Sequence, residues 1–236
     1  MNKKTWIIVG AIVLAFAGML ALSWSSRGGK RVETVSYEDY DLNKVIPADE
    51  QSGGLTENIK GNPNAPILIF EYADYQCEGC ASMNPSLNTL VEEYDGKVAV
   101  VYRGYVLSYH QNGTAAASAA NAAAIQGYWV EFKDLLFSNQ NEWYSASASE
   151  RQTLFENYFM QASGNKGNLA QFRNDMASDE VAQKIEFDRG LAEIVGLEWT
   201  PTIVFDGEVV SREEMSDFLN VMRKKIDAKL KELGKN

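Results

Sequence analysis

The chain has 236 residues, of which 45% are hydrophobic, and this is enough to bury the core of one domain with appended segments. Its formal net charge at pH 7 is -10. Because no basic stripe is present that could neutralise phosphates, the composition argues against nucleic acid as a partner.

An uncharged apolar run occupies residues 6–24 and is long enough to cross the hydrocarbon core of a bilayer. The run predicts a transmembrane helix, preceded by a cytoplasmic tail at residues 1–5. A cleaved signal peptide is the alternative, because Lys3 and Lys4 form a short, positively charged start. Basic residues flank the run on both sides, so their distribution does not set its orientation.

Residues 25–60 are polar and show no sustained apolar period. We expect them to form a linker or stalk, although Tyr37, Tyr40 and Ile46 offer apolar surface that could pack on a domain. The folded domain is then expected to occupy residues 61–236.

The domain begins with a β-favouring run at residues 67–72. After Cys80, apolar residues recur at helical spacing as far as Gly96, with Pro85 inside the predicted helix. A second strand follows at residues 97–103. Strand, helix and strand in this order predict a right-handed crossover and a parallel pair of strands.

The only two cysteines stand between that first strand and the helix, in the tetrapeptide Cys77-Glu78-Gly79-Cys80. With His110 as the single histidine, they do not supply the four ligands of a structural zinc site, and we expect neither a metal nor a cofactor. A disulfide across a two-residue loop also gains little stability from chain entropy. A cysteine at a helix N-terminus has a lowered pKa, so the pair predicts redox exchange, with a structural disulfide or a metal clip as alternatives.

Helical patterns without an intervening strand fill residues 110–196 and predict a helical insertion. Ser149 with Gln152 is typical of a capping box, and Ser178 is typical of the start of a further helix.

Two short strands then follow, at residues 202–205 and 208–210. Asp206-Gly207 between them is typical of a type I′ hairpin. Ser211 with Glu214 predicts a capping box for one last helix. The order βαβ, helical insertion, ββα predicts an α/β thioredoxin fold behind one N-terminal transmembrane helix.

Three stretches carry a more specific resemblance, from about Lys60 to Leu233. The stretches are Gly61-Asn62-Pro63-Asn64-Ala65-Pro66, Glu71-Tyr72-Ala73-Asp74-Tyr75-Gln76 ahead of Cys77, and Glu198-Trp199-Thr200-Pro201-Thr202. They resemble the DsbA-like thiol-disulfide oxidoreductases, nearest the membrane-anchored BdbD type.

This resemblance implies a role for each matching residue. Cys77 would be the exposed nucleophile and Cys80 the buried resolving thiol. Pro201 would be a cis-proline facing the disulfide, and Thr200 would set the redox potential and present its backbone to substrate. Glu71 would be a buried acid that shuttles the proton of the resolving cysteine, since burial raises the pKa of a carboxyl. A solvated carboxylate at the strand end is the alternative for Glu71.

The sequence also departs from the family. Glu78 and Gly79 stand where the strongest oxidases carry Pro-His, and a carboxylate beside Cys77 should raise the pKa of that thiol. We therefore expect a weaker oxidant than DsbA, whose potential is about -120 mV. Trp199 replaces a common glycine, either as core packing or as part of an apolar peptide-binding surface, and His110 is expected to be structural.

The predicted function is a thiol-disulfide oxidoreductase that introduces disulfides into secreted or cell-envelope proteins. Its partners would be folding proteins with free thiols and a quinone-linked membrane reoxidase. The predicted localisation is the cell membrane, with a single pass and the catalytic domain outside the cytoplasm. A reductase or isomerase, for example in haem attachment, and a non-catalytic partner-binding domain are the alternatives.

Overall fold

The computed structural model describes residue 37 and residues 40–235. Their five strands form one sheet in the order β1-β3-β2-β4-β5. β2 pairs with β3 in parallel, as predicted, and the other neighbours are antiparallel. The strands are β1 (Asn58–Gly61), β2 (Ile67–Ala73), β3 (Val98–Gly104), β4 (Thr202–Phe205) and β5 (Glu208–Val209).

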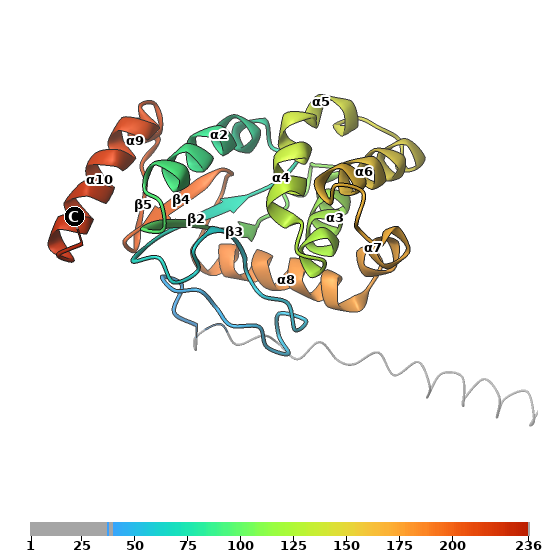
Figure 1. The fold of residues 1–236 in the computed structure, drawn as a ribbon, viewed down its shortest axis with the longest axis horizontal. Coiled ribbons are helices and arrows are strands. Elements are labelled where there is room, and N and C mark those ends of the chain that lie inside the picture. Colours follow the sequence, from blue (N-terminus) through green and yellow to red (C-terminus); the bar gives the residue numbers. More distant parts are fainter. Residues whose placement is uncertain (1–36, 38–39, 236) are drawn as a thin grey trace, which may run out of the picture. The chain divides into compact units, whose positions relative to one another are not determined.

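Helices surround this sheet, and most of them come from the predicted insertion (Figure 1). The helices α3 to α7 gather beside the sheet, while α2 and α10 contact each other and α8 contacts β3. The helices are α2 (Glu78–Glu93), α3 (Gly113–Ile125), α4 (Trp129–Ser138), α5 (Gln140–Trp143), α6 (Ala148–Ala162), α7 (Leu169–Met176), α8 (Asp179–Ile194), α9 (Arg212–Met215) and α10 (Phe218–Glu232).

The apolar core has two parts. One lies between the sheet and the helices α2 and α10, with Ile69, Leu90 and Met222 fully buried. The other fills the helical insertion and extends to Cys80, which is also fully buried. Burial of this much apolar surface is the main force that holds the insertion on the sheet, and the start of α2, at Cys80, is packed into the core of the insertion.

The predicted position of one capping box differs from the structure. The capping box of α6 is formed by Ser147 and Glu150, not by Ser149 and Gln152, because Ser149 already lies inside the helix. The side chain of Gln152 donates instead to Glu156. Both pairs fit the same sequence pattern, and only the position of the turn before the helix decides between them.

The C-terminal elements largely follow the prediction. Asp206 and Gly207 have positive φ angles of 51° and 83°, as a type I′ turn requires. Ser211 and Glu214 form the predicted capping box. The single expected helix is, however, divided into α9 and α10, and Asp217 stands at the N-cap position of the second helix without a side-chain capping hydrogen bond.

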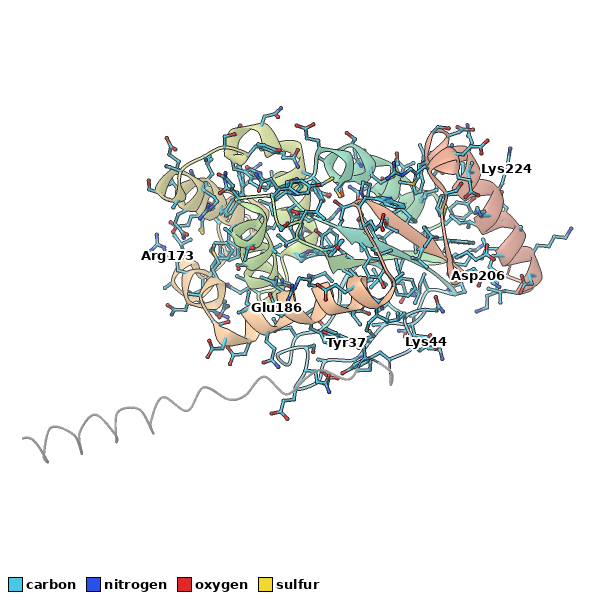
Figure 2. The ribbon with its side chains drawn as sticks, turned by 180° about the vertical axis from the view of Figure 1, so that it is seen from behind. Tyr37, Lys44, Arg173, Glu186, Asp206 and Lys224 are labelled. Atoms are coloured by element: carbon cyan, nitrogen blue, oxygen red, sulfur yellow. The ribbon has the colours of Figure 1, made fainter. Side chains whose placement is uncertain are left out.

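The prediction of a linker at residues 25–60 is wrong from residue 40 onward. Residues 58–61 form β1 and pair with β3. The side chain of Ile46 is buried, and its backbone N–H donates to Glu57 Oε2 at 2.7 Å. Tyr37 stacks on Phe187 of α8, along the face on which Figure 2 labels Tyr37, Lys44 and Glu186.

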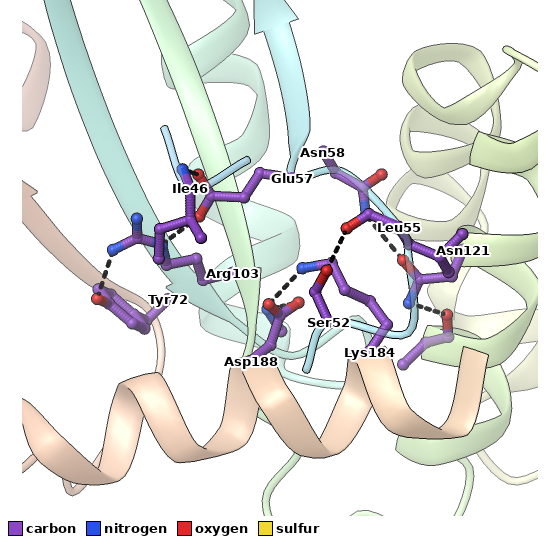
Figure 3. A network of polar contacts seen from close by, with 12 residues as sticks. Ile46, Ser52, Leu55, Glu57, Asn58, Tyr72, Arg103, Asn121, Lys184 and Asp188 are labelled. Carbon is purple, nitrogen blue, oxygen red and sulfur yellow. Dashed lines mark hydrogen bonds and ion pairs between the residues drawn. The ribbon is translucent and has the colours of Figure 1, made fainter. Parts of the chain in front are cut away.

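A buried ion pair fixes this N-terminal segment (Figure 3). Arg103, at the end of β3, donates from Nε to Glu57 Oε1 at 2.5 Å, and neither side chain is solvent-exposed. Its other nitrogens donate to the carbonyls of Leu42 and Lys44 at 2.8 and 3.0 Å, and its guanidinium lies 4.5 Å from the Phe70 ring centroid. Each of the three guanidinium nitrogens thus has an acceptor, and such additional hydrogen bonds are what a buried ion pair requires. Sequence patterns do not reveal such a pair, because its members lie 46 positions apart.

The predicted localisation at the cell membrane is contradicted. Among residue 37 and residues 40–235, no helix has the length and apolarity needed to cross a membrane. The predicted tail at residues 1–5 and the predicted span at residues 6–24 lie outside the described residues.

Replacing Glu57 by Ala is expected to lower the free energy of unfolding by about 3–5 kcal/mol, because it leaves the buried Arg103 charge without a partner. The matched control is Glu93→Ala, which breaks an exposed pair with Arg223 and is expected to cost less than about 1 kcal/mol. Urea denaturation measures both values. Equal losses in the two variants would contradict the structural role of the Glu57–Arg103 pair.

Candidate active site

Cys77 occupies the N-cap of α2, just after the turn that ends β2. Its backbone N–H donates to the carbonyl of Asp74 at 3.0 Å, which fixes the turn. Its thiol is half-buried and donates to the backbone carbonyl of Thr200 at 3.3 Å. The Thr200–Pro201 peptide bond is cis. The tetrapeptide and the loop before β4, 123 positions apart in sequence, therefore face each other.

Gly79 allows this close approach. A Cβ atom at position 79 would lie 3.0 Å from Pro201 Cδ, which is tighter than ordinary van der Waals contact. The small residue between the cysteines therefore fits the proline loop of this chain.

The pKa of Cys77 is lowered to about 5. The hydrogen bond from Cys80 favours the thiolate most, partial burial opposes it, and the Thr200 side chain and the backbone N–H groups of Cys80 and Gly79 add to the lowering. The exposed Glu78 is not among these main influences. The expected increase in the pKa of Cys77 is thus outweighed by groups at the N-terminus of α2.

Cys80 has the opposite environment, one helical turn further along. Burial raises the pKa of its thiol, and the hydrogen bond to Cys77 and the negative charge of Glu71 raise it further. Both cysteines are free thiols. The two sulfur atoms therefore differ sharply in acidity: Cys77 is the stable thiolate and Cys80 the protonated thiol at neutral pH.

Glu71 lies in the centre of β2, with only 2% of its surface exposed, and is therefore not a solvated strand-end carboxylate. Burial raises its pKa to about 7, the nearby Lys133 opposes this increase, and the Cys77 thiolate adds to it. Its Oε1 atom is buried and has no hydrogen-bond partner among the described residues. A carboxyl with a pKa near neutrality and an unpaired oxygen can accept or release a proton.

Lys133, which sequence reasoning missed, brings a buried ammonium from α4 to this region. Its Nζ atom donates to Asp134 at 2.8 Å and to Asn88 at 3.2 Å, and it also contacts Asn84. Burial lowers the pKa of Lys133, while the charges of Asp134 and Glu71 oppose that lowering. In the sequence Lys133 is one polar residue on an amphipathic helix, so no pattern marks it as buried.

Asp74 is a second residue that sequence reasoning did not single out. Its fully buried carboxylate accepts from the backbone N–H of Gln76 at 2.9 Å and of Leu107 at 2.8 Å, and Nδ1 of His110 lies 2.7 Å away. His110 therefore has a carboxylate partner, which the sequence did not reveal. The contact ties the loop after β3 to the segment that carries Cys77, a positioning role in line with the structural role expected for His110.

The surface beside Cys77 is partly apolar. Trp199 is 39% exposed, which excludes the expected alternative of core packing. The guanidinium of Arg212 lies 4.3 Å from the Trp199 ring centroid. A shallow groove begins at Gly79 and runs between α2 and the α9–α10 segment, and its lining includes Met83 and Met215.

The arrangement is suited to thiol-disulfide exchange. It combines an accessible thiolate, a buried second thiol and a carboxyl that can exchange a proton. The described residues hold no group of three or more His, Cys, Asp or Glu side chains that could bind a metal ion.

A model of a protein family described as thioredoxin matches residues 55–224. The chain belongs to the thioredoxin family. This match and the sheet order confirm the predicted thioredoxin-like fold with a helical insertion.

Solved structures of thiol-disulfide oxidoreductases share the fold. A thioredoxin-like oxidoreductase from Silicibacter pomeroyi DSS-3 is 26% identical, with a TM-score of 0.54 over 71% of this chain and 92% of that one. BdbD from Bacillus subtilis, in its oxidised form, is 18% identical, with a TM-score of 0.62 over 81% and 100% of the two chains. The thiol-disulfide exchange protein α-DsbA2 from Wolbachia pipientis is 21% identical, with a TM-score of 0.59 over 76% and 90%.

Several relatives found by sequence comparison are named as Na⁺/H⁺ antiporters. A protein of Salinispora tropica named Na⁺/H⁺ antiporter NhaA 3 is 29% identical over 170 residues, which are 70% of this chain and 23% of that protein. An antiporter NhaA of Herminiimonas arsenicoxydans is 29% identical over 151 residues, which are 64% and 22% of the two chains. The chain thus spans about a quarter of the length of these relatives.

Replacing Glu71 by Gln tests its protonation. The pKa of Glu71 is about 7 in the folded protein, against 4.5 for an ordinary solvated glutamate in the unfolded chain. Between these two pH values the folded state therefore holds a proton that the unfolded state has released. Wild-type stability relative to the variant should therefore fall as pH rises from 4.5 through 7, by roughly 3 kcal/mol in all.

Urea denaturation of the reduced protein between pH 4.5 and 8 measures this difference. The exposed Glu131→Gln variant is the control and should follow the wild type. A constant difference between wild type and Glu71→Gln across this range would show that Glu71 does not titrate as described.

Proposed function

We propose that this chain is a dithiol oxidase that donates the Cys77–Cys80 disulfide to reduced protein substrates. The observation that carries the proposal is the low pKa of Cys77, about 5, next to a buried Cys80. A stabilised thiolate favours the reduced form of the pair, so the oxidised form tends to pass its disulfide on.

The reaction is two successive exchanges. A substrate thiolate attacks Cys77 Sγ, which breaks the Cys77–Cys80 bond, forms a mixed disulfide and releases Cys80 as a thiolate. A second substrate thiolate then attacks the substrate sulfur of the mixed disulfide and releases Cys77 as a thiolate. The substrate loses two electrons and gains one disulfide, and the Cys77–Cys80 pair is reduced.

Glu71 supplies the proton that this sequence needs. Cys80 leaves as a thiolate in surroundings that strongly favour its neutral form, since burial raises its pKa. Glu71, whose pKa is about 7 and whose charge acts on Cys80, holds a proton and is the donor to Cys80. The proton returns to Glu71 or to solvent when the pair is reoxidised.

The loop at Thr200 and Pro201 is the proposed binding edge for the substrate backbone. The Thr200 carbonyl lies 3.3 Å from Cys77 Sγ, where it can accept a backbone N–H of an extended peptide bound beside the disulfide. The groove lined by Met83 and Met215 would take varied apolar side chains, since methionine is adaptable. The proposed partners are therefore unfolded proteins with free thiols.

Turnover requires an oxidant that restores the Cys77–Cys80 disulfide. We propose a quinone-linked oxidase as this partner, because a quinone accepts two electrons and two protons. The reduced pair supplies both electrons and, from the Cys80 thiol, one proton, and solvent supplies the second proton. A reductase or isomerase would instead receive electrons and act on wrong disulfides.

The oxidised chain, mixed with a reduced and unfolded protein with several cysteines, should transfer one disulfide for each Cys77–Cys80 pair. Loss of free thiols measures the transfer. The Cys77→Ser variant should transfer none, and Glu71→Gln should slow the reaction, while Arg223→Ala, on the surface of α10, should match the wild type.

The competing assay is reduction of the same protein with scrambled disulfides. If the reduced chain rearranges scrambled disulfides rapidly and the oxidised chain transfers none to the reduced protein, the chain is an isomerase or reductase rather than an oxidase.

A further inference from the structure

The pair formed by Trp199 and Arg212 is the most unusual feature of the surface around Cys77. Both side chains are exposed, with 39% of Trp199 open to solvent, whereas tryptophan is highly buried on average. The guanidinium lies over the ring at 4.3 Å, a distance typical of a cation–π contact. The ring therefore holds the guanidinium at a defined place beside the cis-proline loop.

Arg212 has no other side-chain partner among residue 37 and residues 40–235. The other five arginines of residues 40–235 each donate to a side-chain oxygen: Arg103 to Glu57, Arg151 to Asn112, Arg173 to Glu156, Arg189 to Glu186 and Arg223 to Glu93. For Arg212 the structure gives no hydrogen bond or ion pair with any described side chain. A guanidinium stacked on a ring keeps the N–H groups at its edge free for an acceptor.

The position of the pair relates it to the reaction. Trp199 directly precedes Thr200, whose carbonyl lies 3.3 Å from Cys77 Sγ. Arg212 and Met215 are three positions apart on α9 and so lie on the same side of that helix, next to the methionine-lined groove. An extended peptide advances about 3.4 Å per residue, so a side chain within roughly three residues of a substrate cysteine can reach the pair.

We propose that Trp199 and Arg212 form a subsite for an acidic side chain of the substrate, on one side of its reactive cysteine. This inference rests on the proposed function and names the class of substrate segment that the site prefers. A carboxylate satisfies the free edge of a guanidinium with two parallel hydrogen bonds. Trp199 is a positioning residue, because it holds Arg212 in place.

Glu78 limits the preference to one side. It is exposed and directly follows Cys77, so its charge disfavours an acidic side chain on the side of the peptide that passes it. The substrate orientation therefore decides on which side of the cysteine an acidic residue helps.

The test uses the Cys80→Ser chain, in which Cys77 is the single thiol, and short peptides whose cysteine is activated with thionitrobenzoate. Cys77 attacks the peptide sulfur, thionitrobenzoate leaves, and its absorbance reports the rate. The peptides carry Asp, Asn or Lys two positions before or after the cysteine and are otherwise identical. The Asp peptide should react about threefold to tenfold faster than the Asn peptide at one of the two positions, as expected for an exposed charge-assisted contact.

Substitutions show which residues cause the difference between the Asp and Asn peptide rates. Arg212→Ala and Trp199→Leu should bring the ratio of Asp to Asn rates close to one, and Arg212→Glu should favour the Lys peptide. Arg223→Ala removes an arginine from α10 and should leave the ratio unchanged. Equal rates for all peptides with the parent chain would overturn the subsite but not the redox function. No reaction with any peptide would overturn the redox function, and the subsite with it.

Discussion

The chemistry of this chain depends on the difference in solvation between two sulfur atoms in the first turn of α2. Cys77 at the N-cap receives hydrogen bonds that favour its thiolate, while Cys80 is buried and kept neutral. The same turn therefore holds a good leaving group and a poor one. Because Cys80 is buried, an attacking thiolate reaches only Cys77 and releases Cys80, and the mixed disulfide then resolves by releasing Cys77, the better leaving group.

The rest of the fold maintains the asymmetry. The loop before β4 brings the Thr200 carbonyl to the Cys77 thiol, and Gly79 leaves room for Pro201. The helical insertion closes over Cys80 and supplies Lys133 on the side of Glu71. The N-terminal segment is held to β3 by Arg103, and this contact contributes to the stability of the sheet.

Sequence patterns predicted those features of the fold and the site that are determined by residues close together in the chain. The parallel pair, the hairpin at Asp206-Gly207 and the place of Cys77 at a helix N-terminus follow from periodicity and turn residues close together in the chain. The role of residues 40–57, by contrast, depends on the contact of Glu57 with Arg103. Lys133 and Asp74 act through contacts with residues distant in sequence, and a polar residue on a helix or after a strand does not reveal its burial. The pKa of Cys77 depends on whether Glu78 or the groups at the start of α2 have the larger effect, and only their positions in the structure decide this.

The redox potential of the Cys77–Cys80 pair, measured by equilibration with reduced and oxidised glutathione at pH 7, tests the central claim most directly. With a pKa of about 5 at Cys77, between the values of about 7 for thioredoxin and about 3.5 for DsbA, the account predicts a potential between about -270 and -120 mV. A potential well above that of thioredoxin supports donation of the disulfide. A potential at or below about -270 mV would show that the pair is a reductant and would contradict the account.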